Sequence, residues 1–176
     1  LLVGFGADKA APELFDIERG VSIGRLPVPV TRVGNYRSVA WSADGLVLVA
    51  AGSSRDDDRR FDAFFFDARS GQMTGRHPVA TDSILDLKAI AGRRFAYAAF
   101  DGTWGVIGDD GVTIRADVKI ADLRGPERLL ISPDATELQW TFENGARPAS
   151  FSFAPGRARK ASMRRSTPFT CSSRPT

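Results

Sequence analysis

Short hydrophobic segments separated by turn residues recur along most of the chain. Turn pairs such as Asp44-Gly45 and Asn144-Gly145 suit hairpins, because Gly, Asn and Asp tolerate positive φ. No segment continues into a long hydrophobic stripe at the 3.6-residue spacing of a helix. The pattern therefore predicts an all-β protein. The predicted strand segments are Leu1–Phe5, Leu14–Ile17, Ser38–Ser42, Leu46–Ala51, Ala63–Phe66, Ile84–Ile90, Phe95–Phe100, Trp104–Ile107, Val112–Ile114, Leu129–Ile131, Leu138–Phe142 and Ala149–Phe153.

The predicted strands fall into a repeated unit of four. Residues 36–80 contain one complete unit, and residues 84–120 repeat its plan. Residues 127–157 begin it again, while the opening residues supply a copy without its first strand. Ser42-Ala43-Asp44 and Ser132-Pro133-Asp134 are separated by two periods of about 45 residues, and Gly71, Gly111 and Gly156 each follow a predicted third strand.

A four-stranded unit with a period of about 40–45 residues is typical of a β-propeller. Val39-Ala40-Trp41-Ser42-Ala43-Asp44-Gly45 resembles the first strand and turn of a WD40 repeat, and Phe100–Val106 resembles its turn between second and third strands. Residues 65–71 and 15–20 are similar to the end of its third strand. The resemblance implies a WD40-like propeller segment over residues 1–156, with about three to four four-stranded blades.

The chain departs from the WD40 pattern at the residues that define it. No Gly-His pair occurs, and Phe66-Asp67 and Phe15-Asp16 replace the Trp-Asp that ends a third strand. The hydrogen-bonded His/Asp arrangement of that family therefore has no counterpart. The run from Trp41 to Phe153 is also similar to propeller regions that accompany bacterial caspase-like peptidase domains.

Just under four units give either a minimal ring or part of a larger one. The chain begins with Leu1 rather than methionine, so we expect a fragment or a processed product. Exposed edge strands tend to pair with other chains, and self-association through open edges is expected.

The net charge of +3 is located in one segment. Six of the 24 basic residues lie in residues 157–176, which contain no acidic residue, so the preceding part is mildly acidic. We expect residues 157–176 to be a disordered tail. No basic face with interleaved aromatic residues is visible, which argues against a nucleic-acid partner. No apolar run approaches the length of a membrane span, so no membrane partner is expected.

Chemistry-bearing residues do not form a recognisable catalytic or metal motif. His77 and Cys171 are the single His and the single Cys, and Cys171 lies in the polar tail, so a Cys/His pair is disfavoured. Asp56-Asp57-Asp58 lacks the alternating spacing of a calcium loop and reads as a solvated hairpin tip. The sequence predicts no catalytic residue, no cofactor and no metal.

The leading functional hypothesis is a non-catalytic propeller segment that mediates interaction with a protein or peptide. The loops that join one unit to the next, and those between second and third strands, are predicted to share one face. A sensor or regulatory region of a larger enzyme, such as a caspase-like peptidase whose catalytic domain lies outside this chain, is the alternative. A propeller enzyme with a polar channel ranks last, because Asp86 is the only acid predicted on an inner strand. The candidate partner-binding residues are Arg32, Asn35, Tyr36, Asp56, Asp57, Asp58, Arg59, Arg60, Thr81, Asp82, Asp101, Thr103, Trp104 and Arg124.

Overall fold

Every regular element of the computed structural model is a β-strand within the residues it describes, which are 2–4, 11–28, 35–55, 60–117, 129–134, 136–140 and 149–152. Consecutive strands pair antiparallel into four separate sheets, and no ladder among them joins one sheet to the next. The strands of the first two units are β1 (Leu2–Gly4), β2 (Glu13–Asp16), β3 (Val21–Arg25), β4 (Tyr36–Trp41), β5 (Val47–Arg55), β6 (Phe61–Asp67) and β7 (Met73–Ala80). Those of the third and fourth units are β8 (Ile84–Ile90), β9 (Arg94–Ala99), β10 (Trp104–Gly108), β11 (Thr113–Asp117), β12 (Leu130–Ile131), β13 (Glu137–Trp140) and β14 (Ala149–Ser152).

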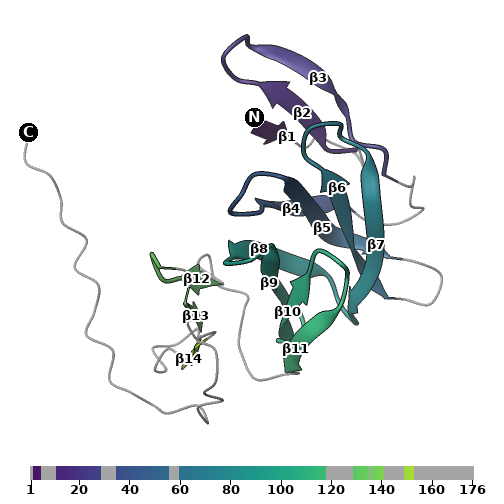
Figure 1. Ribbon diagram of the computed structural model, residues 1–176. Coiled ribbons are helices and arrows are strands. Elements are labelled where there is room, and N and C mark those ends of the chain that lie inside the picture. The colour runs from purple at the N-terminus through teal and green to yellow at the C-terminus, as the bar shows by residue number, and fades with distance from the viewer. Residues whose placement is uncertain are drawn as a thin grey trace, which may run out of the picture.

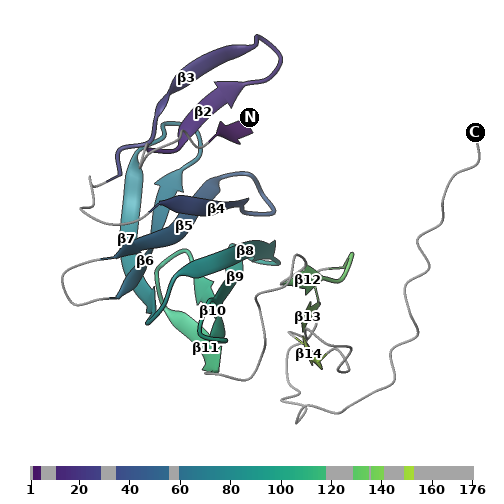
Figure 2. The same cartoon turned by 180° about the vertical axis from the view of Figure 1, so that it is seen from behind.

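The four sheets follow one another along the chain, and their faces pack together (Figure 1). Units two and three each contain four strands in sequence order, and units one and four contain three described strands each. The sheets do not close into a ring, as the view from behind also shows (Figure 2). The prediction of an all-β, propeller-like fold built from meandering units is confirmed.

The first turn of a unit has the same hydrogen bonds in units two and four. The hydroxyl of Ser42 donates to Asp44 at 2.6 Å, and the N–H of Val47 donates to the Ser42 oxygen at 2.9 Å. In unit four the hydroxyl of Ser132 donates to Asp134 at 2.6 Å, and the N–H of Glu137 donates to the Ser132 oxygen at 2.9 Å. The two sequence landmarks are therefore the same turn in two units.

The turn after the third strand is also repeated. The carboxylate of Asp67 accepts backbone N–H groups two and three residues further on, and the carboxylate of Asp16 does the same in unit one. Gly20 (φ 66°) and Gly71 (φ 69°) then close these turns in the left-handed conformation that glycine adopts readily. Gly111 (φ 78°) closes the corresponding turn of unit three, and Gly156 lies outside the described residues.

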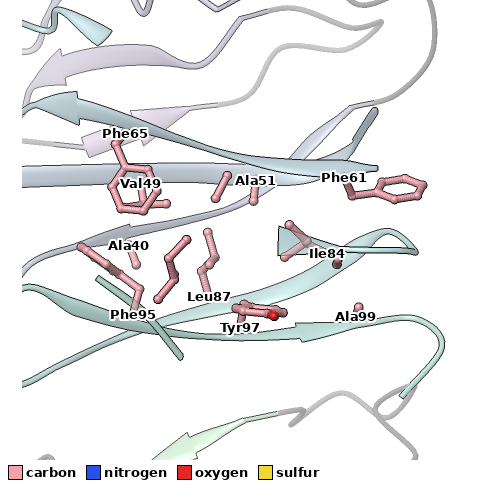
Figure 3. Packing of buried hydrophobic residues seen from close by; sticks show 13 residues of the cluster. Ala40, Val49, Ala51, Phe61, Phe65, Ile84, Leu87, Phe95, Tyr97 and Ala99 are labelled. Atoms are coloured by element: carbon pink, nitrogen blue, oxygen red, sulfur yellow. The ribbon is translucent and has the colours of Figure 1, made fainter. Parts of the chain in front are cut away.

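Strand β6 is buried on both faces because it lies in the middle of the stack. Phe65 faces unit three and packs edge-on to Phe95, with ring centroids 5.8 Å apart. Phe64 and Phe66 alternate to the other face and pack toward Leu14 of unit one. Figure 3 shows the cluster between units two and three, where side chains of β4, β5 and β6 meet those of β8 and β9. The prediction that the phenylalanine run is covered on both faces is confirmed.

A further hydrophobic cluster joins units three and four. Trp104 is only 1% exposed and packs with Ala98, Leu129 and Leu138. Trp41 is partly buried against the cluster between units one and two. These two tryptophans therefore pack between units as predicted, whereas the side chain of Trp140 is outside the description.

Strand β3 forms an exposed outer edge of unit one. Val21 and Ile23 are both at least half exposed, and every residue of the strand is exposed. Unpaired strand edges of this kind are templates for pairing with other chains. The predicted self-association stays a prediction, to be checked by light scattering.

Candidate partner-binding surface

The antiparallel order of the strands divides the loops between two ends of the sheets. Turns β4–β5, β6–β7, β8–β9 and β10–β11 lie at one end, which we call the hairpin end. Loops β5–β6 and β9–β10 and the β7–β8 connection lie at the other, which we call the connection end. Of the predicted residues, the structure describes Asn35, Tyr36, Arg60, Thr81, Asp82, Asp101, Thr103 and Trp104 at or beside the connection end, whereas Arg32, Asp56, Asp57, Asp58, Arg59 and Arg124 lie outside the described residues.

Hydrogen bonds fix the link between units two and three against the β9–β10 turn. The hydroxyl of Thr81 donates to the Asp101 carboxylate at 3.1 Å. The N–H of Phe100 donates to the carbonyl of Ser83 at 2.9 Å, and the N–H of Ser83 donates to the Asp82 carboxylate at 2.6 Å. Two loops about twenty residues apart in sequence thus form one ordered surface.

Asp101 is held in its charged form at this surface. Burial alone would raise its pKa, but hydrogen bonds from the Thr103 backbone N–H (2.9 Å) and from Thr81 outweigh it, and the pKa is lowered. A carboxylate stabilised in this way remains ionised at neutral pH. The surface therefore presents a fixed negative charge with partly open access.

Three of the predicted residues are buried and do not present their side chains. Tyr36 is 6% exposed and packs edge-on to Phe64 with ring centroids 5.5 Å apart. Thr103 and Trp104 are buried as well, because β10 begins there and carries Trp104 into the cluster with unit four. Their side chains are therefore not accessible to a partner in this structure, since a residue beside a turn can already lie on the buried face of its strand.

Phe100 is an exposed aromatic residue, although the sequence pattern predicts it at the end of the strand Phe95–Phe100. It follows the buried residues of β9, which ends at Ala99, and it is 54% exposed. The signal was present in the Asp101-Gly102 pair directly after it, which reverses the chain. Phe100 thus belongs to the ordered surface beside Asp101.

At the hairpin end, ion pairs of Arg93 link unit two with unit three. Arg93, in the left-handed conformation (φ 53°), donates from Nε to the Asp44 carboxylate at 2.6 Å and lies 3.6 Å from Asp109. Hydrogen bonds from Ser42, Arg93 and Leu46 lower the pKa of Asp44 to about 2. A cavity of about 340 Å³ lies beside these ion pairs. It is lined by Leu46, Val47, Phe66, Asp67, Arg69, Thr74, Arg93 and Asp109.

Inner strands are linked by a hydrogen bond that recurs from one unit to the next. The N–H of Leu87 on β8 donates to the Ser38 hydroxyl on β4 at 3.0 Å. The N–H of Leu129, just before β12, donates to the Asp86 carboxylate on β8 at 3.3 Å. Ser38 and Asp86 hold equivalent positions, since each follows the irregularity near the start of its strand. Asp86 thus serves as a structural acceptor between units three and four.

We expect Asp86→Ala to lower the free energy of unfolding by about 1–3 kcal/mol, because the N–H of the buried Leu129 loses its acceptor. Asp86→Asn retains an acceptor oxygen and should cost clearly less. Urea unfolding of the two variants measures the difference. Equal losses would show that the Asp86–Leu129 hydrogen bond does not stabilise this seam.

Among the other residues considered for catalysis or metal binding, the structure describes His77 as part of the packing of unit two. His77 packs edge-on to Phe65, with ring centroids 5.5 Å apart, and Cys171 lies outside the described residues. Over the described ranges, no three or more His, Cys, Asp and Glu side chains are grouped as metal ligands. The same ranges contain no helix with the length and apolarity needed to cross a membrane.

Comparison with known proteins shows similarity to solved structures. No protein-family model and no curated protein matches the sequence. The chain is similar to Kuenenia stuttgartiensis hydrazine synthase (18% identity, TM-score 0.61, 80% of this chain and 39% of that one). It is also similar to dihydro-heme d1 dehydrogenase NirN in complex with DHE (16%, 0.64, 90% and 34%) and to a chain of the mitotic checkpoint complex (16%, 0.57, 76% and 39%).

These neighbours have propeller-type folds, and the chain spans well under half of the length of each. Identities below one fifth show the fold alone. The coarser resemblance, to a propeller segment, is therefore confirmed, whereas membership of the WD40 family and the link to caspase-like peptidases have no support from the comparisons. The chain is similar in fold to a segment of a β-propeller.

Proposed function

We propose that this chain is a non-catalytic propeller segment that recognises a protein or peptide partner at the connection end. We call the surface formed there the connection surface. It consists of Thr81, Asp82, Phe100 and Asp101. The hydrogen bond between Thr81 and Asp101 carries the proposal, because it orders two loops into one exposed patch before any partner arrives. Such preorganisation lowers the entropic cost of binding.

Two further observations support recognition. Loops positioned by a rigid scaffold are where binding residues concentrate, and the sheets below these loops are fully packed. Asp86, the acid on inner strand β8, already accepts a hydrogen bond from the backbone of unit four. A partner therefore reaches the polar groups of the connection end more readily than it reaches Asp86. Since one fold hosts many functions, the proposal rests on this surface and not on the fold.

A second candidate is a regulatory or sensing part of a larger enzyme. Two of the similar structures are named as enzymes, hydrazine synthase and dihydro-heme d1 dehydrogenase, and the chain covers only 39% and 34% of those chains. The sequence of the gene on both sides of this chain tests the candidate. A catalytic domain encoded in frame would support it, and flanking propeller units alone would contradict it.

Selection of peptides from a random display library on the purified chain tests the proposed recognition. Removing the order and the charge together, with Thr81→Val and Asp101→Asn, should weaken the binding of the selected peptides at least about tenfold, because both the fixed loop geometry and the negative charge are lost. The matched control changes Glu18→Gln in the β2–β3 turn and Val112→Ala in the β10–β11 turn, an acid and an exposed apolar residue away from the connection surface. Circular dichroism verifies that both variants remain folded.

The proposal fails if no peptide is selected. It fails equally if the selected peptides bind the connection-surface variant as tightly as they bind the unchanged chain. Equal weakening by the control variant would also contradict it, because binding would then not depend on this surface.

A further inference from the structure

Phe100 gives the connection surface an exposed aromatic side chain on a segment that also carries an acid. Its side chain is 54% exposed at the tip of the β9–β10 turn, directly before Asp101. The hydrogen bond from its N–H to Ser83 holds it next to the β7–β8 connection, where Asp82 lies one residue away. The residue that carries the exposed ring thus joins two loops, each of which contributes an acid.

From this juxtaposition we infer that the partner segment is cationic and apolar, with a lysine or arginine next to an aliphatic side chain. A cation over an aromatic face is attracted by the ring quadrupole, and a carboxylate adds a charge-assisted hydrogen bond. The aliphatic neighbour covers the rest of the ring, as aromatic anchors require when they dominate an interface. The inference rests on the proposed function and specifies the chemistry of its partner.

Charge complementarity favours this partner over an acidic one. Asp101 is ionised at neutral pH, since its hydrogen bonds with Thr103 and Thr81 lower its pKa. Acidic residues outnumber basic ones in residues 1–156, whereas the whole chain carries a net charge of +3, so the attraction of a cation rests on Asp82 and Asp101 themselves. A segment rich in glutamate or aspartate would meet like charge at both Asp82 and Asp101, which disfavours its approach.

Hydrogen bonds within the connection surface hold the side chains of Asp82 and Asp101 in place. The carboxylate of Asp101 accepts hydrogen bonds on both oxygens, from the Thr103 N–H and the Thr81 hydroxyl, and a carboxylate oxygen can accept more than one hydrogen bond. The carboxylate of Asp82 accepts a hydrogen bond from the N–H of Ser83 on one oxygen. A partner ammonium or guanidinium would therefore meet preoriented acceptors, and little side-chain entropy would be lost.

Two synthetic peptides test the inference, one alternating leucine with lysine and one alternating leucine with glutamate. Fluorescence anisotropy with the full chain should detect binding of the lysine peptide, weakening as salt rises because exposed charges are screened. Phe100→Ala and Asp82→Asn should each reduce its affinity about five- to tenfold. Val112→Ala in the β10–β11 turn, at a similarly exposed apolar residue, and Glu18→Gln in the β2–β3 turn should leave the affinity unchanged.

The outcomes separate the inference from the proposed function. Failure of the lysine peptide to bind, or binding that Phe100→Ala does not weaken, overturns the inference. If the glutamate peptide binds instead and Phe100→Ala abolishes its binding, the connection surface is a recognition site and only the inferred partner chemistry is wrong. If peptides selected by display map to another part of the chain, both proposals are wrong.

Discussion

Gly52→Ala is expected to lower the free energy of unfolding by about 3 kcal/mol, since a rigid overlap in a packed strand pair cannot be relieved by rotating a side chain. A Cβ at Gly52 would overlap the carbonyl oxygen of Asn35 and lie 2.8 Å from the backbone nitrogen of Arg37. All of its nearest neighbours are backbone atoms of the segment that begins β4. Accommodating the methyl group would separate β4 from β5 at the register irregularity between Tyr36 and Ser38.

Gly45→Ala supplies the matched control. Gly45 has a φ of 70°, and a Cβ there would meet no atom within 4 Å, so only the left-handed conformation is penalised, by about 1–2 kcal/mol. Chemical denaturation of both variants, followed by circular dichroism, measures the difference. A loss for Gly52→Ala no larger than that for Gly45→Ala would mean that β4 can move away from β5 without cost.

Arg76→Ala is expected to destabilise the protein by about 3 kcal/mol, because it leaves the buried Asp62 carboxylate without its guanidinium. The side chain of Asp62 is only 2% exposed, and Arg76 approaches one of its oxygens with Nη2 at 2.7 Å and with Nε at 2.8 Å. The guanidinium also lies 5.7 Å from the centre of the Phe64 ring, so its removal loses packing on unit two as well. Thermal unfolding combined with urea titration measures the loss.

Adding Asp62→Asn to Arg76→Ala should recover part of the loss, since the buried charge is then removed together with its partner. Arg19→Ala is the control for an exposed pair: the Arg19 side chain is 82% exposed and its nitrogen lies 3.7 Å from Asp16, so the change in stability should be small. An Arg76→Ala variant as stable as Arg19→Ala would show that the Asp62–Arg76 pair contributes nothing net.

Local features of this protein could be predicted from sequence because their causes lie within a few residues. The Ser42-Ala43-Asp44 and Ser132-Pro133-Asp134 turns depend on side chains that bond to backbone two to five residues away, so repetition of the sequence predicts repetition of the turn. The three consecutive phenylalanines from Phe64 to Phe66 likewise indicated a strand covered on both faces, since alternate side chains point to opposite sides.

The sequence predicted the loops of the connection surface, but not which of the side chains beside them are exposed. Thr81, Asp82 and Asp101 follow from the positions of the turns, whereas Tyr36 and Trp104 are buried against other units. Sequence position beside a turn does not say whether a side chain faces solvent or the next sheet. That depends on where each strand begins, and a displacement of one residue changes the face.

The sequence alone determined the strands, the turns and the four-unit repeat, because alternation and turn chemistry act over neighbouring residues. Which distant groups meet depends on the tertiary packing: Asp62 with Arg76, the Asp86 carboxylate with the backbone of Leu129, and Gly52 with the backbone of Asn35. These contacts arise from strand register and from the stacking of one sheet on the next. Both are set by the packing of the whole set of sheets, so no single segment of sequence encodes them.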